Sequence, residues 1–381
     1  MRGILALRRM TGAVVVCVCF EAAVSSEGAA PYPPAAAEAE YDRGAALGAQ
    51  GKLAEAKAAF RAALDIDPNY SPAGEAVTFV EDAEAGRIPA AAVTLTLRAN
   101  EAGSDSRFAD ALRDVDEAIR LAPRHPRPYL TRVQLMIHEG KLEDALDALE
   151  PVFGIAPELA EAYYDRGAML AELSRFDEAI KSYNRALELR PKFYEAYRNR
   201  GSAYVSTNDL QAAIDDYSKA HELYPASAEP FYLRGFLYAL AGEWEAAERD
   251  LTAAIERNAA DEQAHYDRGV VYQNLGDANR ALADFSAAIE LAPDHAAARV
   301  NRGLILMDRR EFDPAIADFE SAFVLDPSLT QAQYNKALAL DRAGRGDAAV
   351  AAYQDFVNRA SPDQAAMVVY AQQRIAAIGG S

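Results

Sequence analysis

The chain has 381 residues, 51% of which are hydrophobic, and a formal net charge of -19 at pH 7. This length and apolar content are ample for a folded protein. The negative charge argues against a general nucleic-acid binder, because such a protein neutralises phosphates with a basic face. Basic or polar protein partners suit this charge better.

Residues 1–26 have the pattern of a secretory signal. Three arginines, Arg2, Arg8 and Arg9, precede an uncharged, largely apolar run over residues 10–20. Small residues follow this run, as in a signal that is cleaved. That run is too short to span a bilayer comfortably. We therefore predict export, to the periplasm or as a secreted protein, with a short inner-membrane anchor over residues 4–24 as the alternative.

Both cysteines, Cys17 and Cys19, lie inside this apolar run. The chain beyond the signal therefore has no thiol to form a disulfide, bind a metal or act as a nucleophile. Residues 27–36 follow as a linker rich in proline and alanine.

A pattern with a period of 34 residues begins at residue 37 and is clearest between residues 160 and 327. There, five glycines recur at that interval, each preceded by an arginine and followed twelve positions later by an alanine: Gly167, Gly201, Gly235, Gly269 and Gly303. A fixed period of this length means that the chain is a repeat array.

The repeat that begins at residue 160 shows the full pattern, with Tyr163, Gly167, Leu170, Ala179, Tyr183, Ala186 and Pro191. This pattern resembles the tetratricopeptide repeat (TPR), a helix-turn-helix unit. Glycine at the eighth place and alanine at the twentieth let helices A and B approach closely, and an aromatic residue at the twenty-fourth fills the space beside the contact. Proline at the thirty-second place ends helix B.

The resemblance implies an all-α fold, a right-handed α-solenoid (superhelix) of about nine repeats with no single central core. The first repeat covers residues 37–70, and eight repeats of period 34 cover residues 92–361. A C-terminal capping helix over residues 362–381 is expected to cover the apolar end of the stack.

Residues 71–91 interrupt the period and are predicted to form an extra helical segment. Ser71 and Pro72 resemble an N-cap followed by proline at the first helical position. This segment either bends the solenoid or separates an N-terminal cap from the main array.

The seventh place of every repeat is basic, and the twenty-third is aspartate in five repeats. Because helices A and B of one repeat are antiparallel, these places should lie near each other. We predict Arg–Asp pairs, such as Arg200 with Asp216 and Arg268 with Asp284. The functional alternative is a stripe that binds anions, but an acid recurring at matched spacing favours structural pairs.

In TPR solenoids the concave surface is lined by helix A, mainly its second, fifth, ninth, twelfth and thirteenth places. The resemblance therefore implies a peptide-binding groove that includes Tyr164, Arg198, Tyr232, Phe236, Tyr266, Gln273, Asn274 and Tyr334, with Tyr41 at the same place in the first repeat. Tyrosine offers a large contact area and a hydroxyl for backbone groups of an extended peptide. The alternative is that these tyrosines only pack along neighbouring helices A.

The sequence offers no chemistry beyond binding. Its five histidines are scattered without metal-ligand spacing, and no phosphate loop, dinucleotide fingerprint or nucleophile elbow occurs. The paired lysines and asparagines with which some family members hold chaperone tails are also absent. We predict neither enzymatic activity nor a metal or other cofactor.

Together these features predict a protein-interaction scaffold that binds an extended segment of another protein in its groove, in the bacterial cell envelope. Nucleic acid is not expected as a partner, and membrane contact is expected only through an uncleaved N-terminus. The alternatives are a membrane-tethered assembly factor and a self-associating structural solenoid.

Overall fold

The computed structural model describes residues 34–104 and 107–379. The predicted signal or anchor, both cysteines and most of the linker lie outside these residues. Within the described ranges the regular structure is entirely helical. No helix there combines the length and the apolar character needed to cross a membrane.

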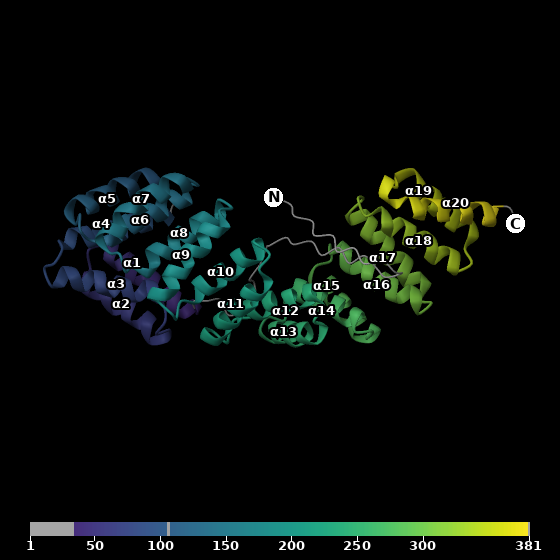
Figure 1. Ribbon diagram of the computed structural model, residues 1–381, viewed down its shortest axis with the longest axis horizontal. Helices are drawn as coiled ribbons and strands as arrows, with labels where there is room; N and C mark the ends of the chain where they lie inside the picture. The colour runs from purple at the N-terminus through teal and green to yellow at the C-terminus, as the bar shows by residue number, and fades with distance from the viewer. Residues whose placement is uncertain (1–33, 105–106, 380–381) are drawn as a thin grey trace. The chain divides into compact units, whose positions relative to one another are not determined.

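The helices follow one another along the chain in pairs (Figure 1). In the first part of the chain they are α1 (Ala35–Ala49), α2 (Leu53–Ile66), α3 (Ser71–Glu84), α4 (Ala90–Ser104), α5 (Phe108–Leu121), α6 (Pro126–His138), α7 (Leu142–Ile155), α8 (Ala160–Glu172), α9 (Phe176–Leu189), α10 (Tyr194–Ser206) and α11 (Leu210–Leu223). The remaining helices are α12 (Glu229–Ala241), α13 (Trp244–Arg257), α14 (Glu262–Asn274), α15 (Ala278–Leu291), α16 (Ala296–Asp308), α17 (Phe312–Leu325), α18 (Thr330–Arg342), α19 (Gly346–Arg359), the 3-10 turn η1 (Pro362–Gln364) and α20 (Ala365–Gly379).

The chain divides into two compact bodies. We call Ala30–Pro230 the N-terminal body and Phe231–Ser381 the C-terminal body. Within each, helix A packs on helix B of its own repeat, as in α8 with α9 and α14 with α15, and helix B packs on helix A of the next, as in α9 with α10. This pairing is that of a TPR solenoid, so the predicted fold class is confirmed.

The close contact between helices A and B explains the recurring glycine. A Cβ atom on Gly269 would lie 2.7 Å from the ring of Phe285, and one on Gly167 would lie 2.7 Å from Tyr183. Real Cβ atoms essentially never come so close, so an aromatic residue at the twenty-fourth place favours glycine at the eighth. Where Val133 occupies the eighth place, the smaller Leu149 packs in the same core cluster.

The turn between helices A and B has a left-handed residue at the fifteenth place. Glycine fills it in most repeats, but Ser174, Asn208 and Arg310 also adopt a φ between 61° and 64°. A side chain makes this conformation costly, which is why glycine is frequent there.

The inserted segment folds back onto the array instead of separating the first repeat from it. Helix α3 occupies the segment, while α1 still packs on α4, helix A of the next repeat. The predicted cap is wrong in one detail. Tyr70 is the N-cap of α3, and Ser71 lies inside the helix, where its hydroxyl donates to Glu75.

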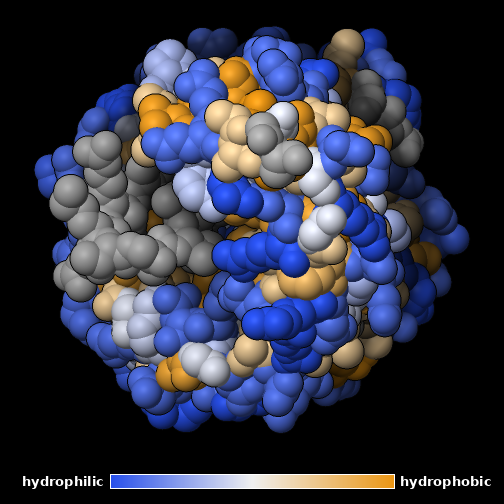
Figure 2. Space-filling view, turned by 90° about the vertical axis from the view of Figure 1, so that its right-hand side faces the viewer, coloured by the Kyte–Doolittle hydropathy of each residue, from blue (hydrophilic) through white to orange (hydrophobic). Residues whose placement is uncertain are grey.

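Helix α20 packs on α19 and leaves part of its surface in solvent. Ser361 and Gln364 form a capping box before it, as their spacing suggests. On the face shown in Figure 2, hydrophilic residues predominate and hydrophobic residues form small, separate patches. Such a surface fits the high net charge of the chain.

Candidate interaction surfaces

The predicted Arg–Asp pairs are confirmed. In each of five repeats the arginine at the seventh place donates two hydrogen bonds, of 2.5–2.9 Å, to the aspartate at the twenty-third: Arg98 to Asp114, Arg200 to Asp216, Arg234 to Asp250, Arg268 to Asp284 and Arg302 to Asp318. This two-pronged geometry suits a guanidinium group and joins helix A to helix B.

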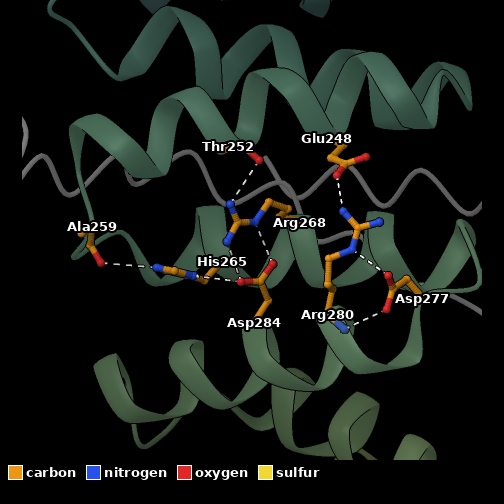
Figure 3. A network of polar contacts seen from close by, with 8 residues as sticks. All are labelled: Glu248, Thr252, Ala259, His265, Arg268, Asp277, Arg280 and Asp284. Carbon is orange, nitrogen blue, oxygen red and sulfur yellow. Dashed lines mark hydrogen bonds and ion pairs between the residues drawn. The ribbon is translucent and has the colours of Figure 1, made fainter.

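The same arginines reach back to the preceding repeat. Arg268 of α14 bonds Asp284 of α15 and also donates to Thr252 of α13 at 3.1 Å (Figure 3). Arg200 and Arg302 donate in the same way to polar side chains of the preceding helix B. These guanidinium groups therefore have partners within the protein, which makes them a structural ladder and not an anion-binding stripe.

The pKa values of the aspartates in these pairs depend on burial and on the hydrogen bonds that the carboxyl groups accept. Burial opposes ionisation of Asp284, but bonds from Arg268 and from His265, 3.2 Å away, outweigh it and lower the pKa of the carboxyl (Figure 3). At Asp216, burial prevails over the bond from Arg200 and raises the pKa.

A second ladder connects the predicted groove tyrosines to the following repeat. The Tyr232 hydroxyl donates to Asp267 at 3.0 Å, while the hydroxyls of Tyr164 and Tyr266 accept from Asn199 at 3.1 Å and from Asn301 at 3.3 Å. Each bond runs from the fifth place of one repeat to the sixth place of the next. We did not predict these bonds, although recurring Asn and Asp at the sixth place provided a signal.

The other predicted groove residues differ in how much surface they offer. Phe236 and Tyr266 are buried, Tyr232 is half-buried with its ring stacked on Phe236, and Asn274 is exposed. Gln273 is half-buried, and its Oε1 atom has no hydrogen-bond partner among the described residues.

Two of the predicted groove residues lie apart from this set. Arg198 bonds Asn199 and Glu229, so Asn199 connects it to Tyr164. Tyr334 packs against rings of α19 and α20, including Tyr370. The tyrosines thus pack along helices A, while Asn274 on the same face is exposed to solvent.

A cavity of about 370 Å³ lies in the N-terminal body. Helix A of five successive repeats contributes to its wall, together with the start of α3. The lining residues are Tyr41, Ser71, Pro72, Asn100, Gly103, Arg127, Leu130, Thr131, Gln134, Leu135, His138, Glu161, Tyr164, Asp165, Phe193 and Glu195. Tyr41 and Tyr164 were predicted as groove residues. Eight of the other lining residues stand at the second, fifth, ninth, twelfth or thirteenth place of helix A, where the family resemblance puts the groove, but were not singled out: Asn100, Gly103, Arg127, Leu130, Gln134, His138, Glu161 and Glu195.

Charged side chains that are largely buried form a network beside this cavity. Glu75 of α3 accepts from Arg127 at 2.7 Å and from Arg190 at 3.0 Å. Arg127 Nη1 lies 3.8 Å from Glu161 Oε2, which is beyond hydrogen-bond distance. The insertion is therefore tied to residues that follow it by 52 and 115 positions.

Burial controls ionisation in this network. Burial opposes ionisation of Glu75, but its hydrogen bond with Glu161 and the charges of Arg127 and Arg190 lower its pKa. Burial and the neighbouring Glu75 raise the pKa of Glu161. Burial also raises the pKa of Asp165 to about 7, although Gln134 hydrogen-bonds its carboxyl.

No cluster of three or more His, Cys, Asp or Glu side chains able to hold a metal occurs in the part of the chain that the structure describes. Fold and surfaces together define a helical repeat scaffold, a class that binds other proteins and is non-catalytic in type.

Comparison with known families identifies the repeat. Models described as tetratricopeptide repeat or TPR repeat match residues 37–70, 160–193, 201–242, 235–296, 266–329 and 300–365. The chain belongs to the tetratricopeptide repeat family. None of the curated proteins matches it.

Several solved structures are similar to parts of the chain. YrrB, described as a TPR protein with an unusual peptide-binding site, is 26% identical over 50% of this chain and 98% of its own, with a TM-score of 0.46. MamA is 27% identical over 42% of this chain and 94% of its own, with a TM-score of 0.41. A TPR protein from Parabacteroides merdae is 21% identical over 66% and 99%, with a TM-score of 0.45.

Proposed function

We propose that the protein binds an extended peptide segment of a partner protein along the helix A face of its repeats. The observation that carries this proposal is the cavity in the N-terminal body, to which helix A of five successive repeats contributes. A segment that crosses consecutive helices A would meet this cavity along its path, since extended peptides bind through main-chain contacts and side-chain pockets.

The chemistry of this face suits a peptide. Tyr41 and Tyr164 supply rings and hydroxyl groups, Asn100 and Gln134 supply amides, and Leu130 supplies an apolar wall. A net charge of -19 favours association with a basic segment.

Selection from a random peptide library on the full chain tests the proposal. Hydrogen exchange of α6, α8 and α10 should slow when a selected peptide binds, while the outer helices α7 and α9 exchange as in the free chain. Slowing confined to α7 and α9, or a library that yields no binder, would contradict it.

A pair of adjacent tyrosines provides matched variants. Tyr164 lines the cavity, whereas the hydroxyl of Tyr163 donates to Pro157. Tyr164→Ala should weaken binding of the selected peptide at least tenfold, while Tyr163→Ala should leave it within about twofold. Circular dichroism of both variants controls for loss of helix.

We propose further that the protein works in the bacterial cell envelope, on the strength of the N-terminal sequence alone. Intact-mass spectrometry of protein recovered from periplasmic and membrane fractions tests this. Loss of about 25 residues from a periplasmic species supports a cleaved signal. A full-length species in the membrane supports the tethered assembly factor, and a full-length species in the cytoplasm contradicts both.

Self-association is a second candidate, because α20 exposes two large apolar side chains. Val369 is 53% exposed and Tyr370 is 42% exposed. Light scattering of the full chain distinguishes the candidates: a monomer at micromolar concentration contradicts self-association, whereas an oligomer dispersed by Val369→Glu supports it.

A further inference from the structure

We propose that the cavity in the N-terminal body is a binding site for an organic cation, the ammonium group of a lysine side chain or of an alkylamine. This inference rests on the proposed function, since it names the side chain that the bound segment would insert. It is carried by the charge of the cavity wall, by a buried carboxylate oxygen without a donor and by the shape of the space.

The wall of the cavity holds more acidic groups than basic ones. Glu161, Asp165 and Glu195 contribute carboxyl groups, whereas Arg127 contributes one guanidinium group, and His138 is exposed at the rim. Arg127 is already bonded to Glu75, which also takes the charge of Arg190. Three carboxyl groups therefore line the cavity beside a single guanidinium group.

One oxygen in the wall lacks a donor. Glu161 Oε2 is buried and has no hydrogen-bond partner among the described residues, and the nearby Arg127 Nη1 is 3.8 Å away. Asp165, one helical turn further along α8, is 9% exposed and also lines the cavity. A buried acceptor left without a donor is costly, and an ammonium group carries three donors.

The rest of the cavity fits the stem of such a ligand. Its volume of about 370 Å³ lies within the usual range for ligand sites, about 300–1,000 Å³. Leu130 and Leu135 offer apolar surface to an alkyl chain, and the rings of Tyr41 and Tyr164 attract a cation.

The C-terminal body shows what the same positions look like without a cavity. There Asp267 occupies the sixth place of its repeat, as Asp165 does, and the Tyr232 hydroxyl from the preceding repeat fills the space and donates to it. The preceding repeat offers Leu130 to Asp165 in place of that tyrosine. At Asp165 the Gln134 amide supplies a hydrogen bond instead of that hydroxyl, and both Leu130 and Asp165 line the cavity.

Binding of a cation should depend on pH, because carboxyl groups that line the cavity titrate. Burial raises the pKa of Asp165 to about 7, so its carboxyl holds a proton below that pH which a bound cation displaces, and burial also raises the pKa values of Glu161 and Glu195. Glu75, Arg127, Arg190 and the Tyr41 hydroxyl face the same groups and contribute to the balance. Affinity should therefore rise between pH 6 and pH 8, with release of protons.

Titration calorimetry on the full chain tests the proposal with two matched pairs of probes. One pair is the peptide Ac-Gly-Gly-Lys-Gly-Gly-NH2 and its norleucine counterpart, and the other is pentylamine and pentan-1-ol. We expect both cations to bind at least tenfold more tightly than their neutral partners. Equal binding within both pairs, or no binding of either cation, would overturn the proposal.

Three variants locate the site. Glu161→Gln with Asp165→Asn should reduce cation binding at least tenfold, and so should Leu130→Tyr, which fills the cavity and supplies the hydroxyl found in the C-terminal body. Asp267→Asn, at the equivalent place outside the cavity, should leave binding unchanged. Unchanged binding in both cavity variants, with helicity retained, would place the site elsewhere and overturn the proposal.

The same measurements distinguish a lysine side chain from a free amine as the ligand, and they distinguish the cation site from the proposed peptide-binding function. Lysine peptide binding tighter than pentylamine binding indicates a peptide side chain, and the reverse order indicates a free amine. If selected peptides bind without any basic residue, the cation site is overturned and the proposed function stands. If pentylamine binds to a chain that selects no peptide, the proposed function fails and the cation site stands.

Discussion

Asp165 and Asp267 occupy the same place of the repeat in the two bodies, and burial raises the pKa of each to about 7. Their surroundings differ. Asp267 receives the Tyr232 hydroxyl and the Gln263 amide. Asp165 is hydrogen-bonded by Gln134 and lines a cavity, and Leu130 occupies the repeat place of that tyrosine. The same acid of the repeat thus meets a tyrosine hydroxyl of the preceding repeat in one body, whereas in the other it meets the Gln134 amide and lines a cavity.

The inserted helix α3 produces the second difference between the bodies. In the N-terminal body it carries Glu75 to Arg127 and Arg190, so charges far apart in sequence meet beside the cavity. In the C-terminal body the charged contacts follow the period of the repeat, as Arg268 with Asp284 does. An insertion between two regular repeats therefore adds a charged network that does not follow the period of the array.

The largest expected effect comes from breaking the network that only the N-terminal body has. Arg127→Met leaves Glu75 and Glu161 in a buried position with one cation fewer, and we expect a loss of about 3–5 kcal/mol in unfolding free energy. Urea unfolding of the full chain, with hydrogen exchange of α3, measures this loss.

The matched variant in the C-terminal body is Arg268→Met. It should cost less, because His265 still contacts Asp284 after the guanidinium group is gone. An equal or larger loss for Arg268→Met would show that the α3 network has no special role in stability.

The next largest effect is a dependence of stability on pH. The carboxyl of Asp267 has a pKa of about 7 in the folded chain and about 3.9 when unfolded, so the folded state holds its proton between these values. The contribution of this carboxyl to the unfolding free energy is most favourable near pH 4. It falls as the pH rises to about 7, by up to about 1.4 kcal/mol per pH unit. Asp267→Asn should flatten the dependence in α12 and α14, as measured by hydrogen exchange at several pH values.

The corresponding change in the N-terminal body sharpens the comparison. Asp165→Asn should flatten the dependence of α8 only in part, because Glu161, whose pKa is also raised, titrates beside it. Complete flattening in α8 would mean that Glu161 does not take part, and an unchanged slope after Asp267→Asn would contradict the assignment of the proton to Asp267.

How well the sequence predicts a contact depends on how far apart in the sequence its two residues lie and on whether that separation follows the repeat period. The Arg200–Asp216 pair was predictable, because both residues lie in one helix pair at a spacing of 16 that recurs along the chain. The bond from Tyr232 to Asp267 was predictable in principle, since it joins places separated by one period and one residue. The contact of Glu75 with Arg190 spans 115 residues outside the period and depends on the path of α3, which no periodicity describes.

A smaller effect tests the packing rule that both bodies share. Gly269→Ala places a Cβ atom 2.7 Å from the Phe285 ring and should cost about 1–3 kcal/mol through overpacking. Gly235→Ala meets Leu251 at 3.1 Å and gains helix propensity of about 1 kcal/mol, so its net effect should be close to zero. Urea unfolding of both variants decides the matter, and equal losses would show that the size of the twenty-fourth residue does not govern the eighth.

The smallest expected effect is a gain in stability at a turn. Arg310 adopts a φ of 64° at the fifteenth place between α16 and α17, where six of the other described repeats of period 34 carry glycine, serine or asparagine with the same sign of φ. Arg310→Gly removes the steric cost of the left-handed conformation, which exceeds the entropy that glycine adds to the unfolded chain, so we expect a gain of about 0.5–1 kcal/mol. The reverse change at the equivalent place of the preceding repeat, Gly276→Arg, should lose a similar amount. If urea unfolding shows both variants to be less stable than the parent chain, the Arg310 side chain contributes a favourable contact that offsets its backbone strain, and the turn is specified by more than its φ.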